Sequence, residues 1–147
     1  KAEIFARDFG CRATDNGEIA SCAKFIFLGV KPQMAEDTCR DLIVPLSERP
    51  GKPVIVSMMA GLTTDTVRKF CGGDYKVIRI MPNIAAAVGE SMTLCTSTDN
   101  VKEDEMETIV EMIDAVLSDV NNEALIAETR KKVFPLRIIK RLSHYKN

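Results

Sequence analysis

Three loops, each directly after an apolar stretch, hold the residues best suited to bind a flat ligand. They are Gly29-Val30-Lys31-Pro32, Met59-Ala60-Gly61 and Met81-Pro82-Asn83. Small residues in such loops let a ligand approach the backbone, whose N–H and C=O groups can then bind it. Open α/β sheets bind ligands at the carboxyl ends of their parallel strands. One glycine after a strand usually marks only a turn, but three such loops favour a shared site.

The elements that must position these loops alternate along the chain. Residues 24–30, 54–58 and 77–80 form near-continuous apolar runs, typical of strands buried on both faces. Helical patterns over 33–44 and 63–71 separate them. Apolar residues spaced three and four positions apart predict a further helix over 101–119. The alternation predicts an α/β fold, with a mostly parallel sheet flanked by helices and right-handed crossovers. A fourth strand is expected over 92–96.

Helix-capping residues, proline and glycine indicate where the predicted helices begin and end. Asp15 and Asn16 are helix-capping types before a short helix, and Thr63 or Thr64 caps the helix that follows the second loop. Pro45 is expected to kink or close the helix over 33–44. Asn100 with Glu103 predicts a variant capping box for the long helix. At the start, residues 1–9 read as a helix that Gly10 stops, and 11–13 as a short strand.

Composition fits one ordinary globular domain. The chain has 147 residues, of which 46% are apolar and 28% charged. No apolar run approaches the ~18 residues of a membrane span. The five cysteines are odd in number and widely spaced, and His144 is the only histidine. A zinc site or a disulfide framework is therefore not expected. We expect instead that the cysteines are buried or half-buried thiols in the reducing cytosol.

Charge is distributed unevenly. From Arg130 onward there are seven basic residues and no acid, which leaves 13 basic and 21 acidic residues, a net charge of −8, in the rest of the chain. Such a tail could contact nucleic acid or a membrane surface. It lacks the interleaved aromatics of a single-strand binder, so a helix lying on its own acidic body is favoured and neither partner is expected. We expect the tail to be dispensable, unless its apolar residues cover a sheet edge; these are Val133, Leu136, Ile139 and Leu142.

The third loop lies in a longer segment that resembles pyrroline-5-carboxylate reductase, the last enzyme of proline biosynthesis. Arg79-Ile80-Met81-Pro82-Asn83, Gly89 and Met92-Thr93 match that family's Arg-(Ile/Val)-Met-Pro-Asn-Thr-Pro-Ala-x-Val-Gly-x-Gly-Met-Thr. Three positions differ: Ile84, Ala85 and Ser91 stand where the family usually has Thr, Pro and Gly. The first loop matches the family's Ala-Val-Lys-Pro, and the second its Ala-Ala-Gly.

The resemblance implies a cofactor site. These loops bind NADP(H) in that family, with NAD as the other possibility, and an Asn fifteen residues before the Lys also contacts the cofactor. The implied cofactor-binding residues of this chain are Asn16, Gly29, Val30, Lys31, Pro32 and Ala60. No catalytic side chain and no metal ligand is implied, since in a hydride-transfer enzyme the cofactor carries the chemistry.

The resemblance covers residues 1–126, which we interpret as a partial Rossmann-like NADP-binding domain, with 127–147 as a basic helical tail. The family's first strand and its phosphate loop precede the segment that matches Lys1, and its helical domain, which makes the dimer and binds pyrroline-5-carboxylate, has no counterpart among these residues. We therefore expect a cytoplasmic pyrroline-5-carboxylate reductase whose 147-residue chain is inactive alone. Two alternatives stay open: a non-enzymatic remnant or interaction domain with a basic tail, and another Rossmann-type dehydrogenase of imines or keto acids.

Overall fold

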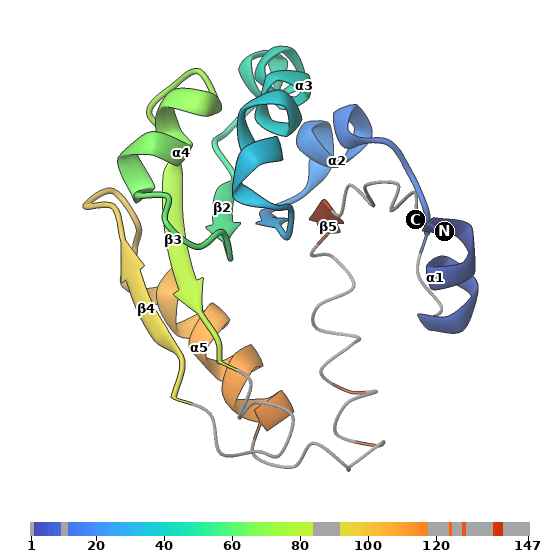
Figure 1. Cartoon of the computed structure of the whole chain (residues 1–147), viewed down its shortest axis with the longest axis vertical. Coiled ribbons are helices and arrows are strands. Elements are labelled where there is room, and N and C mark those ends of the chain that lie inside the picture. The colour runs from blue at the N-terminus through green and yellow to red at the C-terminus, as the bar shows by residue number, and fades with distance from the viewer. Residues whose placement is uncertain are drawn as a thin grey trace.

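The chain folds as a Rossmann-like α/β sheet in a computed structural model that describes residues 2–9, 12–83, 92–117, 124, 128 and 137–139 (Figure 1). Its elements, in chain order, are α1 (Ala2–Phe9), α2 (Asn16–Cys22), β1 (Phe25–Leu28), the short 3-10 helix η1 (Pro32–Met34), α3 (Ala35–Glu48), β2 (Val54–Ser57), α4 (Thr64–Phe70), β3 (Lys76–Met81), β4 (Leu94–Ser97), α5 (Glu103–Leu117) and β5 (Arg137–Ile139). The predicted alternation of strands and helices is confirmed. Among the described residues, no helix is long and apolar enough to cross a membrane.

One sheet contains the five strands that the structure describes, in the order β4-β3-β2-β1-β5. β1 is parallel to β2 and to β5, and β2 is parallel to β3. Only β4 is antiparallel, to β3. The prediction of a mostly parallel sheet is therefore confirmed, and parallel order requires the helical crossovers that the sequence pattern indicated.

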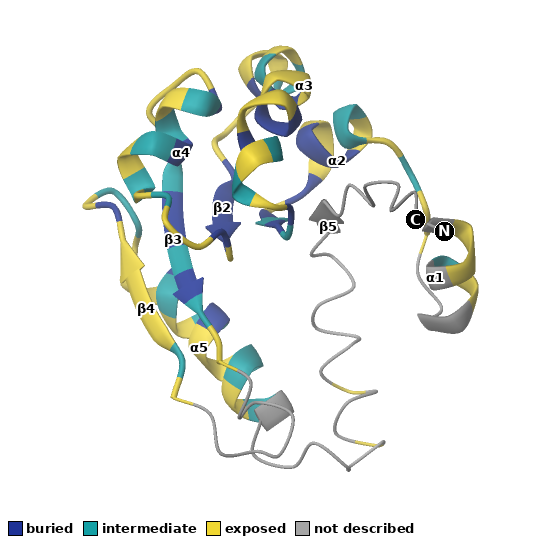
Figure 2. Ribbon diagram, in the orientation of Figure 1, coloured by how far each residue is buried: buried dark blue, intermediate teal, exposed yellow. Residues whose placement is uncertain are grey.

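Successive side chains of β1 point to two separate apolar cores, which explains its continuous apolar run. The first core lies under α2, α3 and α4, and it takes Ile26 and Leu28 from β1 together with Leu42 of α3 and Val67 of α4. The second core takes Phe25 from β1 and Ile109 from α5. Figure 2 shows the contrast between the buried centre of the sheet and β4, whose four residues are all exposed.

Two of the helix caps that the sequence predicts are present in the structure. The Asp15 side chain accepts a hydrogen bond from the backbone N–H of Glu18, at 2.8 Å, and so caps α2. The Thr63 hydroxyl accepts one from the N–H of Thr66, at 3.1 Å, and so caps α4. Each bond satisfies a backbone donor that the first turn of a helix leaves unpaired.

Pro45 was expected to kink or close its helix. It does not close it, because α3 continues to Glu48, and a kink at Pro45 stays a prediction. A proline inside a helix costs about 3 kcal/mol. Leu42 and Leu46, one turn apart on either side of Pro45, are both buried. Burial of two leucines contributes about 3–6 kcal/mol, which is enough to hold the last turn of α3 on the first core.

The short strand predicted over 11–13 is also wrong for the two of these residues that the structure describes. Arg12 and Ala13 are exposed and adopt no regular structure. A strand needs a neighbour, and the edge of β1 that could serve is occupied by β5. Cys11 and the expected stop at Gly10 lie outside the described residues.

The long helix begins with a different cap from the predicted one. Glu105, not Glu103, turns back toward the start of α5, and its carboxylate accepts a hydrogen bond from the N–H of Lys102 at 3.0 Å. The same carboxylate accepts bonds from Lys76 Nζ of β3 at 2.6 and 2.9 Å. Asn100 instead accepts a bond from the guanidinium of Arg68, at 2.7 Å. Glu105 therefore fixes the start of α5 to the sheet.

The prediction of a helical tail is wrong at Arg137–Ile139, which form β5. β5 pairs in parallel with β1, with Ile26 opposite Arg137 and Leu28 opposite Ile139. β1 is buried on both faces, so its backbone on the outer edge would otherwise lack partners. Two adjacent β-branched residues, Ile138 and Ile139, suit a strand better than a helix. This pairing favours the expected alternative in which the tail covers a sheet edge; the division at residue 126 stays a prediction.

Replacing Glu105 by Gln should lower stability at pH 7 by about 1–3 kcal/mol, because the half-buried Lys76 ammonium loses its charged partner. Burial raises the pKa of Glu105, but the hydrogen bonds from Lys76 and Lys102 outweigh it and hold the pKa below its ordinary value. The bridge therefore stabilises the fold above about pH 4.3, the value in an unfolded chain, and less as the pH falls below it. Urea unfolding at pH 7 and pH 3 should show a difference between wild type and Glu105→Gln that shrinks at pH 3. Exposed Glu103→Gln is the control, and an equal loss in it would contradict the assignment.

Replacing Ile138 by Pro should destabilise the whole sheet, because proline removes a backbone donor and fixes φ within β5. We expect the melting temperature, followed by circular dichroism, to fall by about 5 °C, which corresponds to roughly 1–2 kcal/mol for a chain of this length. Ile138→Val, which keeps the donor and the β-branch, should melt within about 1 °C of wild type. Equal melting temperatures for all three proteins would show that β5 contributes nothing to the fold.

Candidate functional site

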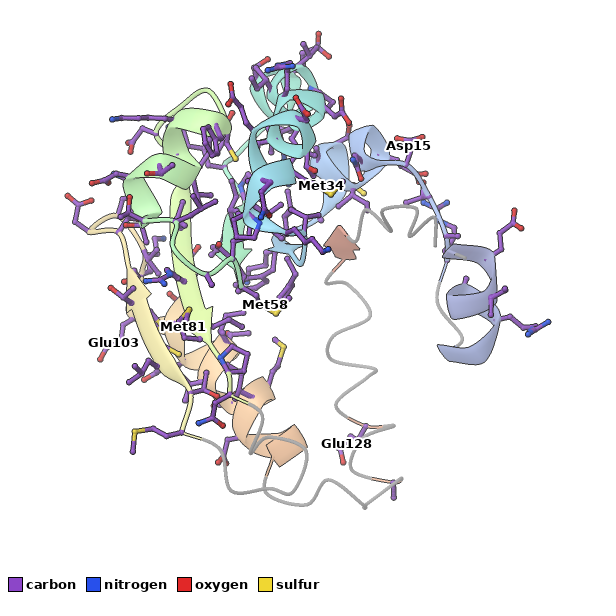
Figure 3. All side chains as sticks on the ribbon, in the orientation of Figure 1. Asp15, Met34, Met58, Met81, Glu103 and Glu128 are labelled. Carbon is purple, nitrogen blue, oxygen red and sulfur yellow. The ribbon has the colours of Figure 1, made fainter. Side chains whose placement is uncertain are left out.

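The carboxyl ends of β1 and β2 are level with one another, and β3 continues two residues past them in the same direction, to Met81. Leu28 lies opposite Ser57, and Ser57 lies opposite Arg79. The loops that leave β1 and β2 therefore begin side by side, and the Met58 N–H donates to the carbonyl of Leu28 at 3.2 Å. We call this side of the molecule the ligand edge, defined by residues 29–32, 58–61 and 82–83. In Figure 3 the labelled Met58 and Met81 lie at the arrowhead ends of β2 and β3.

The first loop combines an anchored residue with an exposed cation. Val30 is buried in the first core, whereas Lys31 is exposed. Lys31 has extended backbone geometry, with φ −65° and ψ 145°, and its carbonyl accepts a hydrogen bond from the N–H of Met34 at 2.9 Å. Pro32 then opens η1, where its missing N–H costs nothing. The loop is therefore rigid, with Gly29 half-buried at its start.

The second loop also combines a buried residue with an exposed one. Met59 is buried and its N–H donates to the hydroxyl of Ser57 at 3.3 Å, while Ala60 is exposed. Gly61 has φ +77°, a left-handed conformation that residues with a Cβ adopt at a cost. The tight turn at Gly61 leads directly to the cap at Thr63, so Ala60 presents its backbone at the ligand edge with only a methyl group beside it.

The third loop is described only in part. Met81 is half-buried at the end of β3, and Pro82 and Asn83 are exposed. Ile84, Ala85, Gly89 and Ser91 lie outside the described residues. The start of the third loop therefore leaves the same edge of the sheet as the first two loops, as the sequence indicated.

Asn16 is the one predicted site residue that the structure does not bring to this edge. It is the first residue of α2 and is half-buried. A Cβ on its neighbour Gly17 would lie 3.7 Å from Pro45 Cγ, in the last third of α3. α3 begins at the ligand edge and runs away from it, and Figure 3 shows Asp15 well apart from Met58 and Met81. A role of Asn16 toward the same ligand stays a prediction.

Arg79 is a polar residue near the site that the sequence brought to notice only as part of the family's motif, not as a site residue. It follows Ile78 in β3, beside Ser57, and its Nη2 donates to Met81 Sδ at 3.2 Å. Its Nε is buried and has no hydrogen-bond partner among the described residues. A charged residue within a β-branched strand was the available signal, because a buried guanidinium needs a partner.

The cysteines of the described residues are free thiols, and they do not form a metal-binding group. Cys39 and Cys71 are buried in the first core, whereas Cys22 and Cys95 are exposed, contrary to the expectation of buried or half-buried cysteines. A hydrogen bond between the Cys39 and Cys71 thiols lowers the pKa of Cys39 and, with burial, raises that of Cys71. Within the described parts of the chain, no three His, Cys, Asp or Glu residues form a group that could hold a metal ion.

Comparison with known proteins agrees with this geometry. Residues 1–61 match a family described as NADP oxidoreductase, coenzyme F420-dependent. The chain is 29% identical over 101 residues to the pyrroline-5-carboxylate reductase of Aquifex aeolicus, a match that covers 69% of this chain and 36% of the relative. The chain therefore spans little more than a third of the length of such relatives.

Solved structures give the same result. A pyrroline-5-carboxylate reductase from Coxiella burnetii superimposes with a TM-score of 0.69 and 28% identity, over 78% of this chain and 42% of that one. The fold is also shared with the Plasmodium falciparum enzyme, solved with NADP bound, at a TM-score of 0.60 and 24% identity, over 69% of this chain and 37% of that one. The chain thus resembles the amino-terminal part of pyrroline-5-carboxylate reductases.

Replacing Gly61 by Ala should strain the second loop through backbone conformation alone, because no atom lies within 4 Å of the new Cβ. The left-handed conformation costs about 1 kcal/mol for a residue with a Cβ, which lowers the melting temperature by roughly 2–4 °C. Gly51→Ala is a matched control, since Gly51 has φ +78° and equally open surroundings far from the ligand edge. Both variants should lose the same stability, and a much larger loss at Gly61 would mean that the loop has hidden steric contacts.

Proposed function

We propose that this chain is the cofactor-binding part of a pyrroline-5-carboxylate reductase. The whole protein would transfer a hydride from NADPH, or NADH, to the C=N carbon of 1-pyrroline-5-carboxylate and so form L-proline. The observation that supports this most is the alignment of Gly29–Pro32 with Met59–Gly61 at one edge of the sheet. These are the loops whose residues match the family, and they lie where open α/β sheets bind cofactors.

The proposed cofactor contacts follow from the two loops. Gly29, Val30, Lys31 and Pro32 would offer backbone groups of a rigid loop, and the Lys31 ammonium would offer a positive charge to an anionic dinucleotide. Ala60 is exposed and small, so a cofactor could lie directly on the backbone between Met59 and Gly61. Asn16 would have to act from α2, on a different part of the cofactor.

The protein's task in such a reaction is to orient the cofactor. A nicotinamide supplies the hydride when it is bound, and the described residues at the ligand edge would fix its position. The buried Val30 and Met59 stabilise the two loops from below, which keeps the geometry of the exposed residues constant. We assign no catalytic side chain and no metal.

A cytoplasmic location is part of the proposal. It is supported by the four cysteines of the described residues, all of which are free thiols. Two of these, Cys22 and Cys95, are exposed, and exposed thiols persist in a reducing compartment.

Replacing Ala60 by Trp should weaken NADPH binding at least tenfold, because the indole would occupy the surface on which the cofactor lies. The exposed position of Ala60 means that the fold should tolerate the larger side chain. Isothermal titration calorimetry with NADPH measures the effect. Ser97→Trp, at an exposed position in β4 away from the ligand edge, is the control and should bind as the wild type does.

Two outcomes would contradict the proposal. If Ala60→Trp and wild type bind NADPH equally tightly, the second loop does not contact the cofactor. If the wild type binds neither NADPH nor NADH at millimolar concentration, the chain is not a cofactor-binding unit by itself, and the non-enzymatic alternative is favoured.

A further inference from the structure

Two buried cysteines from different helices meet in the first core. Cys39 lies in α3, and Cys71 is the residue that caps the end of α4. Both are fully buried, and their thiols share a hydrogen bond. Sulfur atoms in such contact need only a small further approach to reach the ~2.05 Å of a disulfide bond. The fold therefore brings together two thiols that are far apart in the sequence.

The backbone around the two cysteines holds α3 and α4 together. A Cβ on Gly72 would lie 3.2 Å from Ile43 Cγ2. Gly72 directly follows Cys71, and Ile43 is one turn beyond Cys39 on the same side of α3. Gly72 has φ +75°, and its N–H donates to the carbonyl of Lys69 at 3.1 Å. The end of α4 is therefore packed against the part of α3 that contains Cys39, independently of how the two thiols are oriented.

The shared hydrogen bond makes the two thiols chemically different. It holds the pKa of Cys39 below its ordinary value, although burial opposes this, and together with burial it raises the pKa of Cys71. Buried thiols are ordinarily inert because nothing stabilises their thiolate form. Here the Cys71 thiol stabilises the Cys39 thiolate, so Cys39 is the better nucleophile and Cys71 is placed to react with it afterwards.

α4 is the element that can open to admit a small oxidant. It has seven residues, of which Val67 is buried, and Gly72 and Gly73 follow shortly after it. A helix this short contributes little stability of its own, and segments with few buried residues open locally at low cost. The end of α4 can therefore separate briefly from α3 while the sheet stays folded.

We propose that Cys39 and Cys71 form a reversible disulfide when the protein meets hydrogen peroxide. The Cys39 thiolate attacks one peroxide oxygen and becomes a sulfenic acid, while the O–O bond breaks and the other oxygen leaves as hydroxide, which takes up the proton that Cys39 released. The Cys71 sulfur then attacks the Cys39 sulfur, the S–O bond breaks, and the hydroxide leaves with the Cys71 proton as water. Two thiols and one peroxide thus give one disulfide and two waters, and two electrons pass from the sulfurs to the peroxide.

The disulfide would join the two helices that follow the ligand edge. α3 follows the Gly29–Pro32 loop through η1, and α4 follows the Met59–Gly61 loop. Fixing α4 to α3 makes both loops more rigid. A disulfide that forms and is reduced again is the kind that a reducing compartment permits. The inference does not depend on the proposed function, because it concerns the helices behind the edge and not the ligand.

The test uses the wild type and the variant Cys11→Ser/Cys22→Ser/Cys95→Ser, which keeps Cys39 and Cys71 as its only cysteines. After hydrogen peroxide in native buffer, peptide mapping without reductant should find the peptides of Cys39 and Cys71 joined in both proteins. The variant should lose the mass of two hydrogen atoms, and its melting temperature should rise by about 5–10 °C. Dithiothreitol should reverse both changes. Adding Cys39→Ala to the variant is the control, and it should abolish the joined peptides and the rise in melting temperature.

Four results would overturn the inference. These are no reaction with peroxide, a cross-link between two chains, further oxidation of Cys39 to a sulfinic acid without a disulfide, and a disulfide that lowers the melting temperature. The last result would show that the fold opposes the bond, since a bond that the native state favours must stabilise that state in return. If the triple variant does not fold, peptide mapping of the wild type decides alone. The proposed function stands in every case.

Discussion

The parallel register of β1, β2 and β3 is the constraint on which the rest of the structure depends. Because Leu28, Ser57 and Arg79 lie side by side in parallel strands, the loops that follow these strands leave the sheet at one edge, the third of them two residues after Arg79. A shift of one residue would exchange the two faces of a strand and move its side chains from one core to the other. The two cores therefore fix the register, and the register assembles the candidate site.

The burial of β1 also makes unpaired backbone groups on its outer edge energetically costly. Phe25, Ile26 and Leu28 are buried, so the backbone donors and acceptors on that edge have little access to water. β5 pairs with β1 there and satisfies them. At the opposite edge of the sheet, β4 is antiparallel and exposed. Water can therefore hydrogen-bond to its outer backbone groups, and no further strand is needed there. Stability and the location of the tail are thus connected through one strand.

Much of this fold could be predicted from local patterns. The apolar runs before Gly29, Met58 and Met81 marked the strands, and capping residues such as Asp15 and Thr63 marked helix starts. The failures have a common physical cause, which is tertiary contact. Pro45 stays helical because Leu42 and Leu46 hold its helix on the core, and Glu105 replaces Glu103 as the cap because Lys76 of β3 is its partner. Neither contact is visible along the sequence.

The candidate site divides in the same way. The position of Lys31 and Ala60 in loops at the ligand edge could be predicted, because small and polar residues after a buried strand are a local signal, whereas their contact with a cofactor stays a prediction. Asn16 was taken from the family resemblance alone, and the place of its neighbour Gly17 near Pro45 depends on how α2 packs on α3. β5 could not be predicted, since three residues of strand after Pro135 are too short to distinguish from a helical turn before their partner β1 is known.

The most direct test of this account is an NMR titration of the isotopically labelled chain with NADPH. The account predicts that backbone amide shifts will concentrate at residues 29–32 and 58–61, which form the ligand edge, and that β4 and the exposed face of α5 will be unaffected. Shifts centred on β4 or α5, or no shifts at millimolar NADPH, would contradict the claim that the aligned ends of β1 and β2 form a cofactor site.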